Sequence, residues 1–229
     1  MLQFKTSEQC SVELIAHTVL ADAVDTDLND GMDHFPAQAA RVSYANDTRT
    51  HSKEQDGKLI HYLADHEHLT PFEYQHATLM IECPLFIRSQ IHRHRTFSYN
   101  EISRRYTSEE IGFWTPTTWR AQAEKNKQAS EGVVDRSDQL IFNYQADCYS
   151  SAQKYQWMLE AGVCREQARA ILPQSLLTRF YMGGNLRNWA HFLKLREDSH
   201  AQPEVQIVAN KAHTILHDLW PVSLAALML

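Results

Sequence analysis

The spacing of apolar residues predicts two strands in the first half of the chain. Apolar and polar side chains alternate over residues 76–83, which is the period of a strand with one buried face. Pro84 follows directly and predicts the end of this strand, because proline has no N–H to donate to a sheet. A looser alternation over residues 11–19 predicts the second strand.

Helical spacing dominates the rest of the pattern. Apolar positions recur every three or four residues, which is the period of an amphipathic helix. This spacing predicts helices over residues 37–44, 56–66, 140–161, 166–172, 176–196 and 205–219. Pro36 favours the start of the first helix and Asp56 can cap the second. Gly183 and Gly184 interrupt the fifth helix or begin a new one.

The remaining segments are less regular. Residues 85–95 fit a strand or a helix, and we favour the helix, on which Gln90, Arg93 and His94 would share one face. Residues 25–34 are predicted to form an acidic loop, and residues 66–73 a turn-like segment. The mostly polar segment 109–138 is predicted to be a loop or a variable insertion.

These elements indicate an α+β fold. A small, mostly antiparallel sheet packed with helices accounts for the pattern, and 229 residues suit a single domain over 1–229. Apolar residues make up 43% of the chain, which is enough for a packed core. Glycine and proline number seven each, which argues against a turn-rich all-β fold.

Charge is concentrated in one short stretch. Residues 88–105 contain five arginines against one acid, Glu101, so this stretch carries +4 in a chain whose net charge is −6. Guanidinium groups match phosphate and carboxylate oxygens two at a time, so the cluster predicts a specific anionic ligand. The acidic balance of the whole chain disfavours bulk binding to nucleic acid or to an anionic membrane.

Cysteine usage and hydropathy indicate a soluble protein of the cytoplasm. The four cysteines are widely spaced, without a CxxC pair, and are expected to be free thiols in a reducing compartment. The N-terminus has no apolar signal region, and no stretch approaches the roughly 20 apolar residues of a membrane span.

Residue chemistry alone leaves several readings of the basic cluster open. A metal site is disfavoured, because His92 and His94 alternate with arginines and no carboxylate or cysteine completes the set. Ser103 could be a nucleophile, but no GxSxG elbow surrounds it, so we favour a hydroxyl that binds an anionic ligand. Phe97 and Tyr99 among the bases also fit a nucleic-acid-binding loop over residues 88–106, and a solvated basic face is the remaining alternative.

A family resemblance favours one of these readings. Arg93-His94-Arg95, followed after seven residues by Ser103, resembles the signature of flavin-dependent thymidylate synthases, and the similarity extends over residues 90–106. Further segments resemble the family in the same order, namely residues 39–44, 66–73, 162–173, 185–193, 195–196 and 200–202. A chance motif would not match in order over roughly residues 37–202.

The resemblance implies a reaction and its cofactors. Enzymes of this family convert dUMP to dTMP with methylenetetrahydrofolate as one-carbon donor, FAD as hydride carrier and NADPH as reductant. They use no cysteine nucleophile, which agrees with a basic cluster that contains no cysteine. Such a site works by positioning and by charge stabilisation.

The resemblance also implies roles for individual residues. Arg196 corresponds to the catalytic arginine that polarises the uracil ring. The residues expected at dUMP are Gln90, Arg93, Glu101, Ser103, Arg104, Arg105, Arg169 and Arg196. Those expected at FAD are His68, Thr70, Arg93, His94, Arg95, Glu101, Asn185, Arg187 and His191. No metal ligand is expected.

The chain departs from the family pattern at two positions, and the resemblance also implies an assembly. Residue 191 is His where some relatives have Asn, and Arg104 occupies a variable position, which is compatible with a contact through its backbone alone. The family forms homotetramers with shared active sites, in which Arg169 would come from a neighbouring subunit. Segments 1–35 and 107–160 match weakly, so no role transfers to them.

Overall fold

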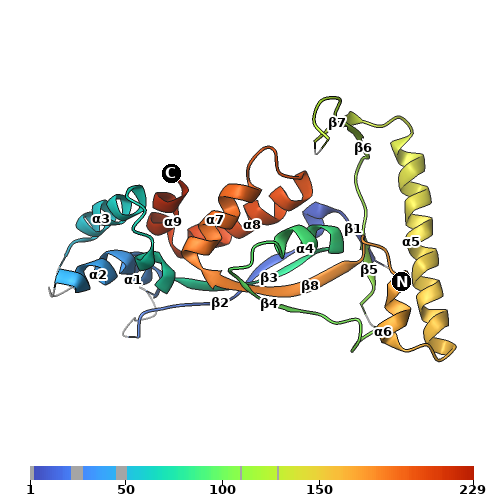
Figure 1. Ribbon diagram of the computed structural model, residues 1–229, viewed down its shortest axis with the longest axis horizontal. Coiled ribbons are helices and arrows are strands. Elements are labelled where there is room, and N and C mark those ends of the chain that lie inside the picture. Colours follow the sequence, from blue (N-terminus) through green and yellow to red (C-terminus); the bar gives the residue numbers. More distant parts are fainter. Residues whose placement is uncertain (1–2, 22–27, 45–50, 109, 128) are drawn as a thin grey trace.

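The computed structural model describes residues 3–21, 28–44, 51–108, 110–127 and 129–229. A four-stranded antiparallel sheet in the order β2-β3-β8-β4 forms its centre (Figure 1). Its strands are β2 (Val12–His17), β3 (His76–Pro84), β8 (Leu177–Asn185) and β4 (Ser98–Glu101). The predicted α+β fold with a small, mostly antiparallel sheet is therefore confirmed.

Helices cover one face of this sheet. The helices are α1 (Leu28–Asp33), α2 (Phe35–Arg41), α3 (Lys53–Asp65), α4 (Leu85–Ile91), α5 (Ser137–Glu160), α6 (Arg165–Ala168), α7 (Leu186–Arg196), α8 (Pro203–Leu219) and α9 (Pro221–Met228). Helices α4, α7 and α8 lie on the same side of the sheet (Figure 1). Their apolar faces bury Leu79, Ile81 and Met182 completely, and Trp189 of α7 is also inaccessible to solvent. The core therefore lies between these helices and one side of the sheet.

The opposite face of the sheet is open. Met80 on β3 is paired with Tyr181 on β8, and Tyr181 is paired with Asn100 on β4, so these side chains share that face. Tyr181 is 45% exposed. Glu13 on β2 is paired with Met80, so this face carries both polar and apolar side chains.

The segment 109–138 is more ordered than a plain loop. Strand β5 (Gly112–Trp114) is buried and pairs in parallel with β1 (Gln3–Lys5). Strands β6 (Arg120–Gln122) and β7 (Ser130–Val133) form an antiparallel pair that extends away from the central sheet (Figure 1). That this segment is a variable insertion stays a prediction, as does the single domain.

Helices α1 and α9, near opposite ends of the chain, are joined by a buried aspartate. The backbone N–H groups of Val222 and Ser223, in the first turn of α9, each donate to the Asp33 carboxylate at 2.8 Å. The Ser223 hydroxyl donates to the Asp33 carbonyl oxygen at 2.6 Å. Asp33 thereby supplies the acceptor that the first N–H groups of α9 need.

The structure corrects four expectations about elements. The largest correction is that residues 177–185 form β8 and not part of a helix. Residues 28–33 form α1, so the predicted acidic loop is wrong there, and residues 25–27 lie outside the described part. Helix α3 is capped by Ser52, because the Asp56 carboxylate is buried in an ion pair with Arg41. Helix α4 ends at Ile91, four residues earlier than predicted.

Candidate active site

The basic motif begins in a tight turn at the end of α4. His92 caps the helix, and the chain then turns through residues 93–97 into β4. Arg93 and Arg95 are exposed, whereas His94 between them is only 7% exposed. The Tyr99 hydroxyl lies 3.1 Å from the Ile91 carbonyl oxygen and 2.9 Å from that of His94, which holds the turn closed. The turn therefore directs one basic side chain inward and two outward.

His94 is joined to Arg196, the predicted catalytic residue at the end of α7. Arg196 Nε donates to His94 Nε2 at 3.0 Å. A guanidinium group can only donate, so Nε2 of His94 must be the acceptor and the ring proton must lie on Nδ1. This contact joins residues 102 positions apart in the chain. It leaves the two terminal nitrogens of Arg196 without a partner among the described residues.

Burial, with smaller contributions from Arg196 and His191, keeps His94 neutral. Burial is the largest cause that lowers the pKa of His94 to about 4, and Arg196 and His191 lower it further. The ring centroids of His94 and His191 are 6.2 Å apart, and Phe192 packs edge-on against His94 at 5.0 Å. Burial also lowers the pKa of Arg196. A neutral imidazole is therefore the stable partner of a cationic, partly desolvated guanidinium.

Glu101 ends β4 on the side of the sheet that faces α4. Its Oε1 accepts a hydrogen bond from the Thr178 hydroxyl at 2.6 Å and lies 3.4 Å from Arg88 Nε. The carboxylate is only partly exposed, at 26% of its side chain. Two neighbouring groups thus fix the lone acid of the cluster close to its bases.

Ser103, Arg104 and Arg105 lie in the turn after β4. The Ser103 hydroxyl accepts from the backbone N–H of Arg105 at 3.2 Å. Arg105 lies 3.5 Å from Glu166 in α6, and Arg169 Nε donates to the Glu166 carbonyl oxygen at 3.3 Å. Arg105 and Arg169 of the same chain therefore both contact Glu166 of α6. Both side chains are exposed.

Four of the residues expected at FAD lie at the start of α7 or near the 3-10 helix that is joined to it, namely His68, Thr70, Asn185 and Arg187. Asn185 caps this helix, with its Oδ1 accepting from the Asn188 N–H at 2.9 Å. Arg187 forms an ion pair with Glu73 at 2.5 Å, which ties α7 to the short 3-10 helix Thr70–Tyr74. Thr70 begins that 3-10 helix and is exposed, as is His68 just before it. Arg187 and His191 share one face of α7, as predicted from their spacing.

The aromatic residues of the motif are not a platform for nucleic-acid bases. Phe97 is buried at 8% exposure and packs against Trp189 with ring centroids 4.8 Å apart. Tyr99 packs against His92 at 4.2 Å and uses its hydroxyl within the turn. Rings committed to the core cannot stack on bases. Phe97 and Tyr99 therefore do not support a nucleic-acid-binding loop over residues 88–106.

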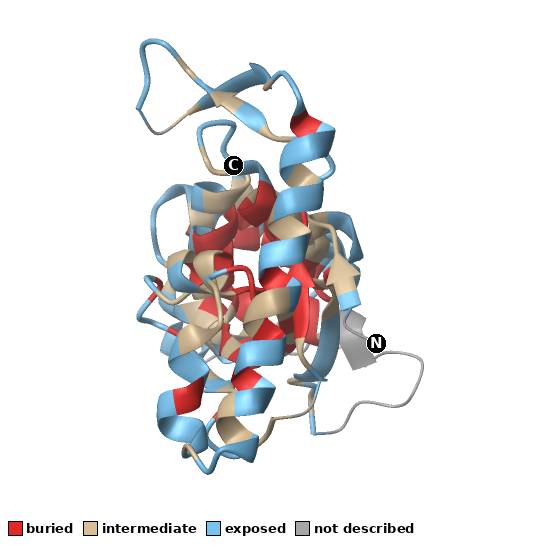
Figure 2. Cartoon of the chain, turned by 90° about the vertical axis from the view of Figure 1, so that its right-hand side faces the viewer, coloured by how far each residue is buried: buried red, intermediate tan, exposed pale blue. Residues whose placement is uncertain are grey.

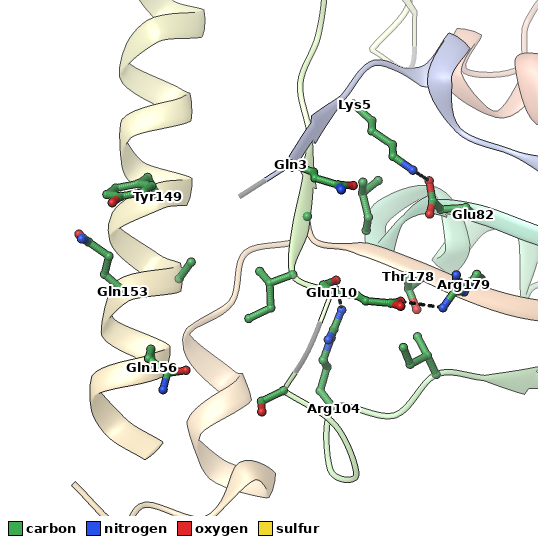
Figure 3. Close-up of a pocket in the computed structure, with 16 residues that line it drawn as sticks. Gln3, Lys5, Glu82, Arg104, Glu110, Tyr149, Gln153, Gln156, Thr178 and Arg179 are labelled. Atoms are coloured by element: carbon green, nitrogen blue, oxygen red, sulfur yellow. Dashed lines mark hydrogen bonds and ion pairs between the residues drawn. The ribbon is translucent and has the colours of Figure 1, made fainter. Parts of the chain in front are cut away.

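A pocket of about 680 Å³ lies between α5 and the end of the sheet (Figure 3). Arg104 reaches into it and donates to the Glu110 carbonyl oxygen at 2.9 Å. The other charges are paired, with Lys5 2.6 Å from Glu82 and Arg179 2.7 Å from the Glu110 carboxylate. Arg104 is the one predicted site residue that lines the pocket. This pocket is thus separate from the contact of His94 with Arg196.

Within one chain, the structure brings some of the predicted residues together. The ring centroids of His94 and His191 are 6.2 Å apart. Asn188, in the first turn of α7, donates to the Thr96 carbonyl oxygen at 3.0 Å, so the start of α7 touches the turn that carries the basic motif. Helix α3, which precedes His68, and helix α6, which precedes Arg169, lie towards opposite ends of the long axis (Figure 1). The predicted face of Gln90, Arg93 and His94 does not exist as a helix face, because α4 ends at Ile91.

Three polar residues joined to Gln90 were not predicted from the sequence, namely Gln202, Glu204 and Arg120. Gln202 accepts a hydrogen bond from Gln90, and it is followed by the buried Glu204, which pairs with Arg120 of β6. Gln202 lay in a segment that resembles the family, but nothing in the sequence connected it with α4 or β6.

Comparison with known proteins identifies the family. The model of the family described as thymidylate synthase complementing protein matches residues 26–222. The chain belongs to this family. A flavin-dependent thymidylate synthase of Thermus thermophilus is 41% identical over 198 residues, which cover 86% of this chain and 72% of that protein. One from Thermosipho melanesiensis is 40% identical over 196 residues, 83% of each chain.

A solved structure gives the same answer for the fold. The UMP/dUMP methylase PolB from Streptomyces cacaoi, bound with 5-Br dUMP, superposes on this member of the family with a TM-score of 0.84. The match covers 98% of this chain and 96% of that chain at 28% identity. In the described part of this family member, no helix is both long and apolar enough to cross a bilayer.

Proposed function

We propose that this enzyme makes dTMP from dUMP by reductive methylation. The observation that carries the proposal is the family match over residues 26–222, within which every predicted site residue lies. Methylenetetrahydrofolate would donate the one-carbon unit, and NADPH would be the reductant. The cofactor is a flavin, which we take to be FAD. The location in the cytoplasm stays a prediction.

The chemistry of the basic side chains fits a flavin dinucleotide. Arg93 and Arg95 are exposed and without partners among the described residues, so their guanidinium groups are available to bind diphosphate oxygens. His68, Thr70, Asn185, Arg187 and His191 would complete the FAD contacts, together with Glu101 and His94. When bound and reduced, the flavin supplies the hydride for the new methyl group. The protein residues bind and orient it.

Arg196 would act on the uracil ring of dUMP. Its Nε is committed to His94, so its two terminal nitrogens remain to donate to a uracil oxygen. A fixed cation at that position stabilises the negative charge that develops on the ring. Neutral His94 orients the cation without competing with it for charge. Gln90, Arg93, Glu101, Ser103, Arg104, Arg105 and Arg169 would bind the rest of the nucleotide.

The thiols are poor candidates for a nucleophile. Burial raises the pKa of Cys10 to about 11, and burial likewise raises the pKa of Cys83 well above its usual value. Cys148 is buried, and Cys164 lies exposed before α6. Since a thiolate and not a thiol attacks, Cys10 and Cys83 are unreactive at neutral pH. This supports a mechanism without covalent attachment of dUMP to the enzyme.

We further propose that the active site is shared within a homotetramer. Helix α3, which precedes His68, and helix α6, which precedes Arg169, lie towards opposite ends of the long axis (Figure 1), which supports this, because residues near both ends are expected to contact the flavin or the nucleotide. The open face of the sheet supports it too. No partner other than these small molecules and identical subunits is expected.

Substitution of Arg196 tests the function. We expect Arg196→Ala to retain its flavin, seen in the visible spectrum, and to lose dTMP formation by about 100-fold or more, the effect of removing one charge-stabilising donor. The assay measures dTMP by mass spectrometry with dUMP, NADPH and methylenetetrahydrofolate present. Lys194→Ala is the matched control, because it removes an exposed cation from the same last turn of α7 and should leave activity unchanged.

Two results would contradict the proposal in different ways. Full dTMP formation by Arg196→Ala would remove this residue from catalysis. A colourless wild-type preparation that takes up no FAD would remove the flavin reaction itself.

A further inference from the structure

Gln90 begins a chain of side-chain hydrogen bonds that ends in the β6–β7 hairpin. Its Nε2 donates to Oε1 of Gln202, the residue before α8. Gln202 Nε2 donates to Glu204 Oε2 at 2.8 Å. Both terminal nitrogens of Arg120 contact the Glu204 carboxylate, at 2.8 and 3.0 Å. Arg120 Nε also donates to Ser130 Oγ at 2.8 Å, across the hairpin.

Glu204 is the charged centre of this chain. It is 6% exposed, and burial by itself raises its pKa. The hydrogen bonds from Arg120 and Gln202 outweigh burial, so the pKa of Glu204 lies below its ordinary value. The group is therefore a carboxylate at neutral pH, and a carboxylate only accepts hydrogen bonds.

One fixed acceptor sets the direction of every bond in the chain. Because Glu204 only accepts, Gln202 must turn its NH₂ group towards it. The carbonyl oxygen of Gln202 then faces Gln90, which must present its own NH₂ group. Gln90 is left with one N–H and its carbonyl oxygen, neither of which has a partner among the described residues. The Glu204 carboxylate thus determines, through Gln202, the orientation of the Gln90 amide, which could otherwise rotate freely.

We infer that Glu204 is a positioning residue that acts through Gln202 to fix which end of the Gln90 amide faces the nucleotide. The carbonyl oxygen of Gln90 is then held ready to accept from an N–H or O–H of the bound nucleotide. The inference rests on the proposed function, because it takes Gln90 as a dUMP contact. Arg120 takes part because both of its terminal nitrogens hold the carboxylate, which gives the β6–β7 hairpin a role in positioning the Gln90 amide.

A purely structural role is the competing explanation. Arg120 and Glu204 also join the hairpin to α8, and their loss could loosen the fold without any effect specific to Gln90. A double-mutant cycle separates the two explanations, because coupling through Gln202 makes the effects of Glu204 and Gln90 non-additive.

The experiment measures dUMP binding to the FAD-loaded enzyme by calorimetry. Glu204→Gln keeps the shape of the side chain but can present an N–H to Gln202, so the direction of the chain is no longer fixed. We expect dUMP to bind roughly five- to ten-fold more weakly, the effect of one hydrogen bond, with unchanged flavin content. In a Gln90→Ala background, Glu204→Gln should cause no further loss. Glu82→Gln, which removes a carboxylate paired with Lys5, is the control and should bind dUMP normally.

Each other outcome overturns the inference for an identifiable reason. Additive losses in the double variant would mean that Glu204 stabilises the fold and does not act through Gln90. Normal dUMP binding by Glu204→Gln would refute the inference and leave the proposed function standing. Normal binding by Gln90→Ala would remove Gln90 from the site. Absence of dUMP binding by the wild-type enzyme would overturn the proposed function itself, and the inference with it.

Discussion

The lowered pKa of His94, which accepts a hydrogen bond from Arg196, has a consequence for stability. The folded protein keeps His94 neutral down to about pH 4, whereas a histidine in the unfolded chain takes up a proton near pH 6.5. Between these values the unfolded state binds more protons than the folded state. The contribution of His94 to stability is therefore complete above pH 6.5 and declines as the pH falls towards 4.

This sign can be tested by measuring stability against pH. We expect the free energy of unfolding, from urea titrations between about pH 4 and 7, to fall by about 1–3 kcal/mol more in the wild type than in His94→Gln over this range. Glutamine can accept from Arg196 but does not titrate. Identical pH profiles for the two proteins would show that His94 is not the group responsible.

At the scale of single residues, the sequence revealed identities but not contacts. The residue types of the motif, taken with a family resemblance, were enough to select His94 and Arg196. Their hydrogen bond could not be predicted, because it depends on where α4 ends and on how α7 packs. The cap of α3 shows the same limit. Asp56 is a good capping residue, yet the competing ion pair with Arg41 comes from α2, and a local pattern cannot show it.

At the scale of elements, β8 is the instructive error. Residues 177–185 alternate between buried and more exposed positions, yet the apolar run continues into α7 and resembles one long helix. The two glycines mark the end of a strand and not an interruption of a helix. Long helices such as α5 were predicted almost completely, because their period persists over many turns.

Residue 184 must be a glycine because Phe97 packs directly against its backbone. A Cβ atom there would lie 2.6 Å from Cδ1 of Phe97, which is closer than atoms can approach. We expect Gly184→Ala to displace Phe97 and to lower the free energy of unfolding by about 1–3 kcal/mol in chemical denaturation. Gly57→Ala is the matched control. It lies inside α3 with its nearest neighbour at 3.9 Å, so alanine should raise stability by up to about 1 kcal/mol. Unchanged stability of Gly184→Ala would mean that the ring moves without cost.

At the scale of the whole molecule, two surfaces expose large aromatic side chains that the described chain does not cover. One is the open face of the sheet around Tyr181. The other is on α5, where Phe142 and Trp157 are 72% and 67% exposed. This helix lies on the side of the molecule that faces the viewer in Figure 2. Large exposed aromatic side chains are typical of interfaces between subunits.

The proposed tetramer can be tested on the first of these surfaces. We expect light scattering to give the mass of four chains for the wild type, and a smaller mass for Tyr181→Arg, because an unpaired charge would be buried in the interface. Leu229→Arg, at a residue that is 85% exposed at the C-terminus, should remain tetrameric. A tetrameric Tyr181→Arg would exclude this face, and a monomeric wild type would contradict the assembly.

The contact of Asp33 with α9 has a consequence for the order of folding. Its partners, Val222 and Ser223, are 189 and 190 residues further along the chain. During synthesis, α1 therefore leaves the ribosome long before α9 has been made, and Asp33 cannot form these hydrogen bonds until then. Such distant pairings slow folding and lengthen the time in which a nascent chain depends on chaperones.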